Sequence, residues 1–400
     1  MFRHLLKLIW KRKARNVMLS LEILLAFLIV FAISAFAVRN LQLYRMPIGF
    51  EYQDRWSVRV QTPDNMEGAT DVGSYQRFRS ALLALPEVEQ VAFVSFSPFR
   101  SATMRTDFES ADGKQVRSDM IEMSDEFPAL AGMRLLEGRW FGPADDGADA
   151  VPVILNRRAA RTLFPSGPAV GKTFLEGDRD DKKRTLYKVS GVIEEFRNKG
   201  EFMVPVNYTL TRYVPRPAND HGFKSIMLKL KPGTPRTFEA ALNRQLKLLR
   251  ADWGYTISPL ADLRSDKLRW DLMPLIVGAV IAAFLLVMVG FGLFGVLWQN
   301  TTQRIPEIGL RRALGASAGH IYTQIVAEQM LLSSAAMALA LLLLVQLPIT
   351  GALGESLNWL VFCGAALLSM GVIYLISLLC SLYPGWRASR LSPTQALHYE

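Results

Sequence analysis

The sequence predicts an α-helical membrane domain of four transmembrane helices joined to an α+β domain of two subdomains outside the membrane. Half of the 400 residues are apolar. Four apolar runs are each long enough to cross a hydrocarbon core of about 30 Å, which needs about 20 helical residues. A long stretch of mixed polar and apolar sequence separates the first run from the other three. The runs are 17–38, 272–298, 325–347 and 359–382.

The distribution of basic residues predicts the orientation of these runs. Residues 1–16 alternate apolar and basic positions at helical spacing, which indicates an amphipathic helix on the membrane surface. Arginines also occur in the connection 299–324 and in the tail 383–400, whereas the connection 348–358 has no Lys or Arg. Because short loops rich in Lys and Arg stay in the cytoplasm, we expect both termini inside and residues 39–271 outside. This is the topology of a multi-pass membrane protein with a large domain outside the cytoplasm.

The net charge of +10 has a simple explanation in this topology. A basic chain can bind nucleic acid, but the densest basic cluster here directly precedes the first span. There it fixes topology and contacts anionic headgroups, so we expect membrane lipid and no nucleic acid as a partner. The first run is too long for a cleavable signal peptide and stays as an anchor. Cys363 and Cys380 both lie in the last run, about 25 Å apart along one helix, which is too far for a disulfide.

The exterior segment reads as two β-α-β units that flank a middle insertion. Strand-like alternation at Trp56–Val60 is followed by a helical pattern and by a second strand at Val88–Phe96. The order recurs with a strand at Ser225–Leu230, a helix, and a strand at Tyr255–Ile257. The two units therefore predict one subdomain built from both ends of the segment. Short β runs at 151–155 and 187–193 predict a second, mostly β subdomain between them. Helical spacing at 39–44 and 261–270 predicts that the first two spans continue beyond the bilayer as a stalk.

Small residues in the second run predict close helix packing. Without a hydrophobic force between helices in lipid, small side chains let backbones approach each other. The positions that we single out are Gly278, Ala282, Gly292 and Gly295. Glu22 in the first run has two interpretations. It contacts another helix or a ligand, or it is a carboxylate near the interface that pairs with Arg15 or a neighbouring chain.

The sequence predicts no cofactor and no catalytic or metal site. Gly290–Gly295 matches GxGxxG but lies inside a span with no preceding strand, and Gly167–Thr173 resembles a phosphate loop that is one residue short. The histidines have no other His or Cys at metal-ligand spacing. No nucleophile elbow or HExxH helix occurs. We therefore expect a non-catalytic membrane subunit.

The segment QRIPEIGLRRALGAS, residues 303–317, predicts a short cytoplasmic helix that a soluble partner binds. Pro306 suits the first helical position, Glu307 favours the helix dipole, and Gly315 ends the helix. Ser317 then caps the next helix. Arginines on lipid phosphate would explain part of this pattern, but anionic lipid would repel Glu307. The residues that we expect to form the docking surface are Glu307, Ile308, Gly309, Leu310, Arg311, Arg312, Leu314 and Gly315.

These residues support a family resemblance. QRIPEIGLRRALGASAGHI, with AEQMLL after it, resembles the signature of the FtsX/MacB-type ABC transporter permeases. The tail YPGWRASRLSPTQALHYE resembles the ending of that family. The segments MRLLEGRWF, VPVILNRRAARTLFP and GPAVGKTF resemble its periplasmic domain. The resemblance covers essentially the whole chain.

The resemblance implies a mechanism and partners. Such permeases pair with a second permease chain, identical or a paralogue, and dock a dimer of cytoplasmic ABC ATPase subunits at a coupling helix. ATP-driven movement then passes along the stalk, 39–50 and 261–271, to the periplasmic domain. That domain would consist of a porter-like part, 51–119 and 208–260, and a sabre-like part, 120–207. Pro306 and Ala318-Gly319 depart from the family pattern, which suggests a dedicated ATPase. MacB carries a fused amino-terminal ATPase and this sequence shows none, so we expect a separate ATPase subunit.

Three functions fit this resemblance. The first is MacB-like export of a peptide, drug or other amphipathic substrate, with a periplasmic membrane-fusion adaptor and an outer-membrane channel as further partners. The second is FtsX-like signalling to periplasmic cell-wall hydrolases. The third is lipoprotein extraction of the LolC/LolE type. We expect the first because the exterior domain is large and contains a β insertion.

Overall fold

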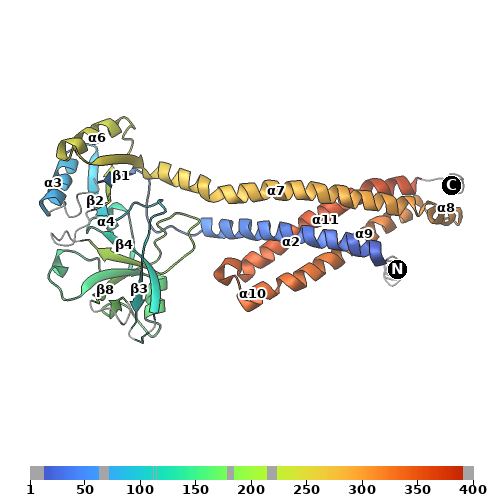
Figure 1. Cartoon of the computed structure of the whole chain (residues 1–400), viewed down its shortest axis with the longest axis horizontal. Helices are drawn as coiled ribbons and strands as arrows, with labels where there is room; N and C mark the ends of the chain where they lie inside the picture. The colour runs from blue at the N-terminus through green and yellow to red at the C-terminus, as the bar shows by residue number, and fades with distance from the viewer. Residues whose placement is uncertain are drawn as a thin grey trace. The chain divides into compact units, whose positions relative to one another are not determined.

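The computed structural model describes residues 13–62, 72–110, 112–113, 115–177, 184–213 and 223–390. The chain divides into two compact units (Figure 1). We call Met1–Gln42 with Leu272–Glu400 the helix unit, and Leu43–Asp271 the sheet unit. Most of the amphipathic helix expected at 1–16 and the end of the tail lie outside the described residues.

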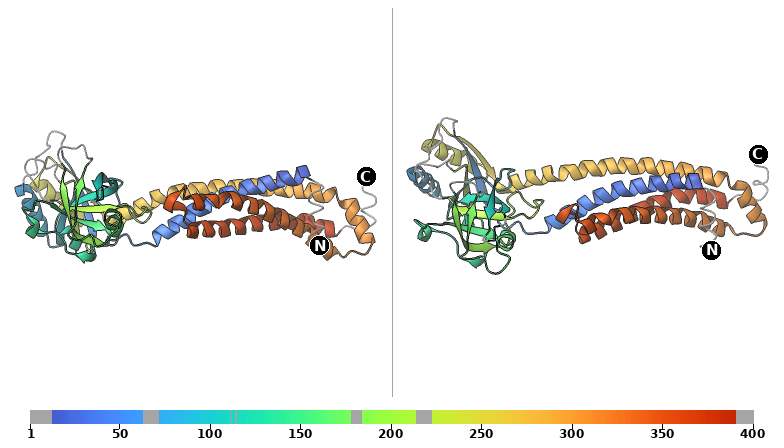
Figure 2. Two further views of the ribbon diagram at one scale, coloured as in Figure 1. Left: turned by 90° about the horizontal axis from the view of Figure 1, so that it is seen from below. Right: turned by 60° about the horizontal axis from the view of Figure 1, so that its bottom comes forward.

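Four long helices dominate the helix unit, and each contains a stretch long and apolar enough to cross a membrane. This confirms the prediction of four candidate membrane helices, while the boundaries of the spans stay a prediction. The helices run side by side in both views of Figure 2. Shorter helices connect them: α8 precedes α9, and α10 and the 3₁₀ helix η2 precede α11. The elements are α2 (Lys13–Tyr44), α7 (Leu260–Thr302), α8 (Ile305–Ala313), α9 (Ala318–Leu344), α10 (Gln346–Thr350), η2 (Gly354–Leu357) and α11 (Trp359–Ser389).

Packing within the helix unit is uneven. One apolar cluster joins α2, α9 and α11, includes Phe27, Met337 and Ala365, and reaches α7 at Leu293. The hydroxyls of Ser333 on α9 and Ser377 on α11 are 2.8 Å apart, a contact that small residues permit. By contrast, only 6% of the most apolar stretch of α7 is buried within the chain, against 22–33% for the other three helices. Most apolar side chains in this stretch of α7 are therefore exposed among the described residues.

The described residues of the sheet unit contain eleven strands and four α-helices, besides the ends of α2 and α7. The strands are β1 (Arg55–Gln61), β2 (Val88–Val94), β3 (Met104–Glu109), β4 (Gln115–Met123), β5 (Leu135–Gly138), β6 (Val151–Asn156), β7 (Thr173–Glu176), β8 (Leu186–Ile193), β9 (Tyr208–Arg212), β10 (Ser225–Leu230) and β11 (Gly254–Pro259). The helices are α3 (Val72–Leu83), α4 (Phe127–Leu130), α5 (Arg157–Leu163) and α6 (Phe238–Leu249), with a 3₁₀ turn η1 (Pro143–Asp145).

Both predicted β-α-β units lie in a four-stranded antiparallel part of one eleven-stranded sheet, which continues from β2 to β4. Its order is β11-β1-β10-β2, so the strands of the two units alternate as in a ferredoxin-like fold. Alternate residues of these strands lie under α3 and α6, where Phe78, Leu82, Leu242 and Leu246 are buried. The two ends of the segment thus share one core, as the sequence predicted.

The middle segment forms a closed ring of strands in the order β4-β3-β7-β8-β6-β9. Strand β9 pairs in parallel with β4, from Tyr208 opposite Asp119 to Arg212 opposite Met123, and this pairing closes the ring. Aromatic rings fill the interior, where Phe108 meets Phe174 edge to face at 4.9 Å. The predicted strands at 151–155 and 187–193 are confirmed as β6 and β8. The pairing favours a β subdomain from β3 to β9, which is wider than the expected 120–207; the boundary of the sabre-like part stays a prediction.

Candidate functional site

Helix α8 is the predicted coupling helix, and both of its ends are formed by local interactions. It begins at Ile305, so Pro306 is its second residue rather than its first. At the other end Gly315 has φ +95°, and its amide donates to the carbonyl of Arg312 at 3.1 Å. The amide of Ala316 donates to the carbonyl of Arg311 at 3.0 Å, which completes a Schellman motif. A glycine is required here because the left-handed conformation is costly for other residues.

One face of α8 packs against its own chain. Ile308 forms a small buried cluster with Ile321 on α9 and Ala388 on α11. Gly309 is buried as well. Of the eight residues expected at the docking surface, these two therefore face inward in this chain. Their contacts hold α8 against the ends of the two long helices.

Ion pairs and hydrogen bonds hold α8 in one orientation. Arg311 pairs with Glu307 one turn earlier at 2.6 Å and donates to the side-chain oxygen of Gln324 on α9 at 2.9 Å. Just before the helix, Arg304 pairs with the largely buried Glu328 of α9. Arg312 donates to the carbonyl of Ala316 at 3.3 Å. The arginines of this segment thus fix its position with respect to α9.

Two leucines project from the opposite side of this segment. Leu310 is 59% exposed and Leu314 is 80% exposed. Glu307 and Arg311 are partly exposed beside them. Exposed apolar side chains next to charged ones are typical of a surface that another protein covers. Four of the predicted residues are therefore accessible together: Glu307, Leu310, Arg311 and Leu314.

The small residues of α7 differ in what they contact. A Cβ at Gly292 would collide with the carboxylate of Glu22 on α2, and a Cβ at Gly278 would lie 4.0 Å from Ile33. Ala282 is buried. Gly295 has no atom within 4 Å of a Cβ position among the described residues. Gly292 thus creates the space that Glu22 occupies, whereas the small size of Gly295 is not required by this chain's own packing.

An aromatic cluster between α7 and α11 was not predicted from the sequence. Trp298 stacks on Tyr383 with ring centroids 5.8 Å apart, and the guanidinium of Arg387 lies 4.4 Å from the Trp298 ring centre. Tryptophan, tyrosine and arginine in this combination are typical of a membrane–water interface. The helical spacing of Tyr383, Trp386 and Arg387 after the last apolar run was the available signal.

A buried arginine in the sheet unit was also missed. Arg197 is 1% exposed and donates to the carbonyls of Leu43 and Met46, each at 3.0 Å, and to the carbonyl of Met203 at 2.8 Å. Leu43 belongs to the last turn of α2. From the same loop, Glu201 pairs with Arg264 in the first turns of α7. One loop therefore holds both stalk segments to the sheet unit.

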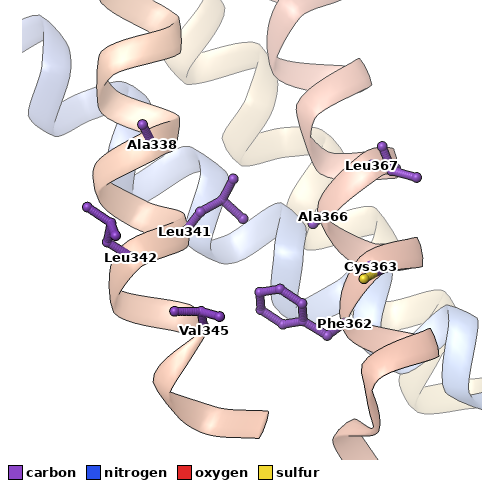
Figure 3. Close-up of a pocket in the computed structure, with 8 residues that line it drawn as sticks. All are labelled: Ala338, Leu341, Leu342, Val345, Phe362, Cys363, Ala366 and Leu367. Carbon is purple, nitrogen blue, oxygen red and sulfur yellow. The ribbon is translucent and has the colours of Figure 1, made fainter. Parts of the chain in front are cut away.

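The helix unit also contains an apolar recess of about 700 Å³ between α9 and α11. Figure 3 shows Leu341 of α9 and Phe362 of α11 pointing into the space between the two helices. Cys363 has the only polar side-chain atom among the eight lining residues. Such a surface suits acyl chains or apolar side chains. Among the described residues no group of three or more His, Cys, Asp or Glu side chains could hold a metal ion.

Comparisons with known proteins agree with this architecture. The family model of the MacB-like periplasmic core domain matches residues 22–245, and that of the FtsX-like permease C-terminal domain matches residues 279–393. The macrolide export ATP-binding/permease protein MacB of Marinobacter nauticus is 23% identical over 360 residues, which are 86% of this chain and 50% of that protein. MacB of Bdellovibrio bacteriovorus is 26% identical over 68% of this chain and 43% of that protein. The chain thus spans about half the length of these relatives.

A shorter relative and a solved structure complete the comparison. The ABC transporter permease YknZ of Bacillus subtilis is 24% identical over 70% of this chain and 69% of that protein. The periplasmic region of MacB from Actinobacillus actinomycetemcomitans superimposes with a TM-score of 0.40 at 14% identity, covering 56% of this chain and 97% of that structure. The two family models together span both units. The chain therefore belongs to the family of MacB/FtsX-like ABC transporter permeases, with a periplasmic-type domain and four membrane helices.

Proposed function

We propose that this chain is the permease subunit of a MacB-like export system, which transmits ATP-driven movement from a separate cytoplasmic ATPase to the periplasmic domain. The transported substrate would be a peptide, a drug or another amphipathic molecule. One observation carries the proposal: α8 has one face held by its own chain and another that exposes Leu310 and Leu314. A segment built in this way can receive a force from a bound partner and pass it to the helices that anchor it.

The anchoring contacts define the route of that force. Arg311 and Arg304 connect α8 to α9 through Gln324 and Glu328. In the sheet unit, the Arg197 loop connects the last turn of α2 and the first turns of α7 to the strands. A movement that reaches these helix ends would therefore pass to the strands of the sheet unit through hydrogen-bonded contacts.

The exposed apolar surface of α7 supports a second permease chain as a further partner. Most of its apolar side chains have no cover within the chain, and Gly295 lies in an uncovered position. Small residues on an open helix surface allow another helix to approach closely. We propose that α7 lies at the contact between two permease chains, identical or paralogous.

Substitution of Leu314 tests the ATPase proposal. Full-length Leu314→Asp, expressed with its ATPase, should retain at most about a tenth of the wild-type ATPase on purification, because a charge replaces an apolar contact at the docking surface. Leu248→Asp is the matched control, since Leu248 is 76% exposed but lies on α6 of the sheet unit. Equal ATPase recovery from both variants, or no ATPase with the wild-type chain, would refute the proposal.

A further inference from the structure

A cavity of about 980 Å³ lies in the sheet unit, on the face of the four-stranded sheet opposite α3 and α6. Successive side chains of β1 point to opposite faces of the sheet. Val58 and Val60 are buried under the helices, whereas Arg59 between them lines the cavity. The segment between β2 and β3 and the first turns of α7 form the other walls. Its volume is in the range of small-molecule binding sites.

One wall of the cavity is apolar and aromatic. Phe96 and Phe99 are buried, and Leu263 and Trp270 of α7 line the same cavity. Trp270 is 70% exposed at the rim. Such a wall favours a ligand with an extended apolar body.

The backbone at Phe99 is held in an unusual conformation. Its φ of +63° is rare for a bulky side chain. The amide of Phe99 donates to the carbonyl of Asn198 at 2.6 Å, and its ring packs on Phe50 and Tyr52. Conformations of this kind persist where the surroundings enforce them, often at binding sites. Here the turn directs the chain so that the next residue, Arg100, lines the cavity.

Basic side chains line the cavity as well. Arg59, Arg100, Lys224 and Lys267 line the cavity against two acids, Glu122 and Asp266. Lys267 pairs with Asp271. Among the described residues neither Arg59 nor Arg100 has an acidic partner, and the Nε of Arg100 is buried without a hydrogen-bond acceptor. Burial and the nearby charge of Arg59 lower the pKa of Arg100. Two guanidinium groups without a counter-ion in a half-enclosed site favour the binding of an anion.

We infer that this cavity binds an amphipathic anion, with a carboxylate or phosphate between Arg59 and Arg100 and an apolar body against Phe96, Phe99 and Trp270. The excess of positive charge disfavours cationic amphipaths. The inference goes beyond the proposed export function and does not depend on ATPase docking. Failure of the binding test would leave the Leu314 result unaffected, so the two proposals can fail separately.

The first experiment uses the full chain in phosphatidylcholine nanodiscs and a long-chain fatty acid that carries a photoreactive diazirine. Cross-linked peptides, identified by mass spectrometry, should contain the Phe96–Met104 segment and the turns of α7 near Trp270. Unlabelled palmitate should compete. Hexadecanol, which has the alkyl chain without the charge, should not compete. Acetate, which has the charge without the alkyl chain, should not compete either. Competition by hexadecanol equal to that by palmitate, or labelling confined to the helix unit, would overturn the inference.

Charge variants give the second test. Arg59→Glu should weaken palmitate binding by about tenfold or more, because it removes a charged hydrogen-bond donor and adds repulsion. Arg100→Gln should weaken it similarly, while Arg100→Lys keeps the charge and should keep most of the binding. Arg117→Gln is the matched control, because Arg117 is exposed on β4 and pairs with Asp107. Wild-type affinity in both Arg59→Glu and Arg100→Gln would overturn the inference.

A third experiment tests whether the bound carboxylate belongs to a lipid acid or to a peptide. An apolar peptide with a free carboxyl terminus is compared with its amidated form as a competitor of the labelled fatty acid. Competition by the free peptide at lower concentrations than palmitate would assign the cavity to peptide carboxylates, and the reverse order would assign it to lipid acids. Equal competition by the amidated and free peptides would contradict recognition of an anion.

Discussion

At the scale of single residues, Glu195 is a carboxylate that the sheet unit buries in part. Burial raises its pKa above 4.5, although Asn156 donates to it at 3.3 Å. The pKa of Glu195 is higher in the folded state than in the unfolded chain, so protonated Glu195 stabilises the folded state. This stabilisation is lost as the pH rises through the folded-state pKa. The ionised group therefore reduces stability at neutral and basic pH.

A substitution that removes this charge has a predictable pH dependence. Glu195→Gln should raise the unfolding temperature at pH 8, and the gain should shrink toward pH 4.5, where Glu195 itself becomes protonated. Calorimetry of the full chain at the two pH values measures the effect. Glu194→Gln is the control, because Glu194 is exposed and pairs with Arg157. A gain that is the same at both pH values would contradict the assignment.

Gly292 permits a second test at this scale. In Gly292→Ala the new Cβ meets the Glu22 carboxylate, so the variant should unfold at a lower temperature than Gly295→Ala, where the added methyl group meets no neighbour in this chain. Adding Glu22→Ala should recover most of the loss, with a coupling of about 0.5–3 kcal/mol between neighbouring positions. Additive effects of the two substitutions in thermal unfolding would show that Glu22 does not occupy this space.

At the scale of elements, hydroxyl contacts join α9 and α11. Ser333 meets Ser377 at 2.8 Å, and Ser334 meets Tyr374 at 2.7 Å. Hydrogen bonds between membrane helices contribute about 0.6 kcal/mol on average. A double-mutant cycle of Ser333→Ala and Ser377→Ala should give a coupling of this size in denaturant unfolding. A coupling indistinguishable from zero would show that the two hydroxyls do not interact in the membrane.

Elements with a local signal could be predicted from the sequence, and those set by distant contacts could not. The strand Ser225–Leu230 and the span 359–382 follow from runs of apolar residues. The pairing of β4 with β9 has no local signal, because it depends on how the ring of strands packs around Phe108 and Phe174. The burial of residues in the predicted coupling helix could not be predicted from the sequence either. Its amphipathic pattern predicted a helix, but only the positions of α9 and α11 decide that Ile308 is covered and Leu310 is exposed.

Polar residues buried far from any motif were the least predictable. Arg197 looks like any charged residue in a loop, and its role depends on carbonyls from segments at Leu43 and Met203 that the fold brings together. Arg100 is similar, because only the folded structure shows that its Nε is buried without a hydrogen-bond acceptor among the described residues. Sequence patterns reveal where a chain is apolar, but they do not reveal which buried polar atoms remain unsatisfied.

At the scale of the whole molecule, the orientation in the membrane is the central prediction. In a background without native cysteines (Cys363→Ala and Cys380→Ala), a cysteine at Asp149 of the sheet unit should react with an impermeant maleimide in spheroplasts. A cysteine at Gln303, next to α8, should react only after the membrane is opened. Both positions are exposed. Labelling of Gln303→Cys in intact spheroplasts would place α8 outside and exclude ATPase docking there.

Helix α7 runs from Leu260 to Thr302 without interruption and contains Pro274. A proline inside a helix leaves the carbonyl four residues earlier, here that of Trp270, without its usual backbone donor, so the helix bends most easily at this turn. Rotation about the helix axis is still transmitted, because the backbone is covalently continuous. We therefore expect the turn at Pro274 to yield to sideways tilt while it passes on torsion, and this turn follows Trp270, which lines the proposed anion cavity.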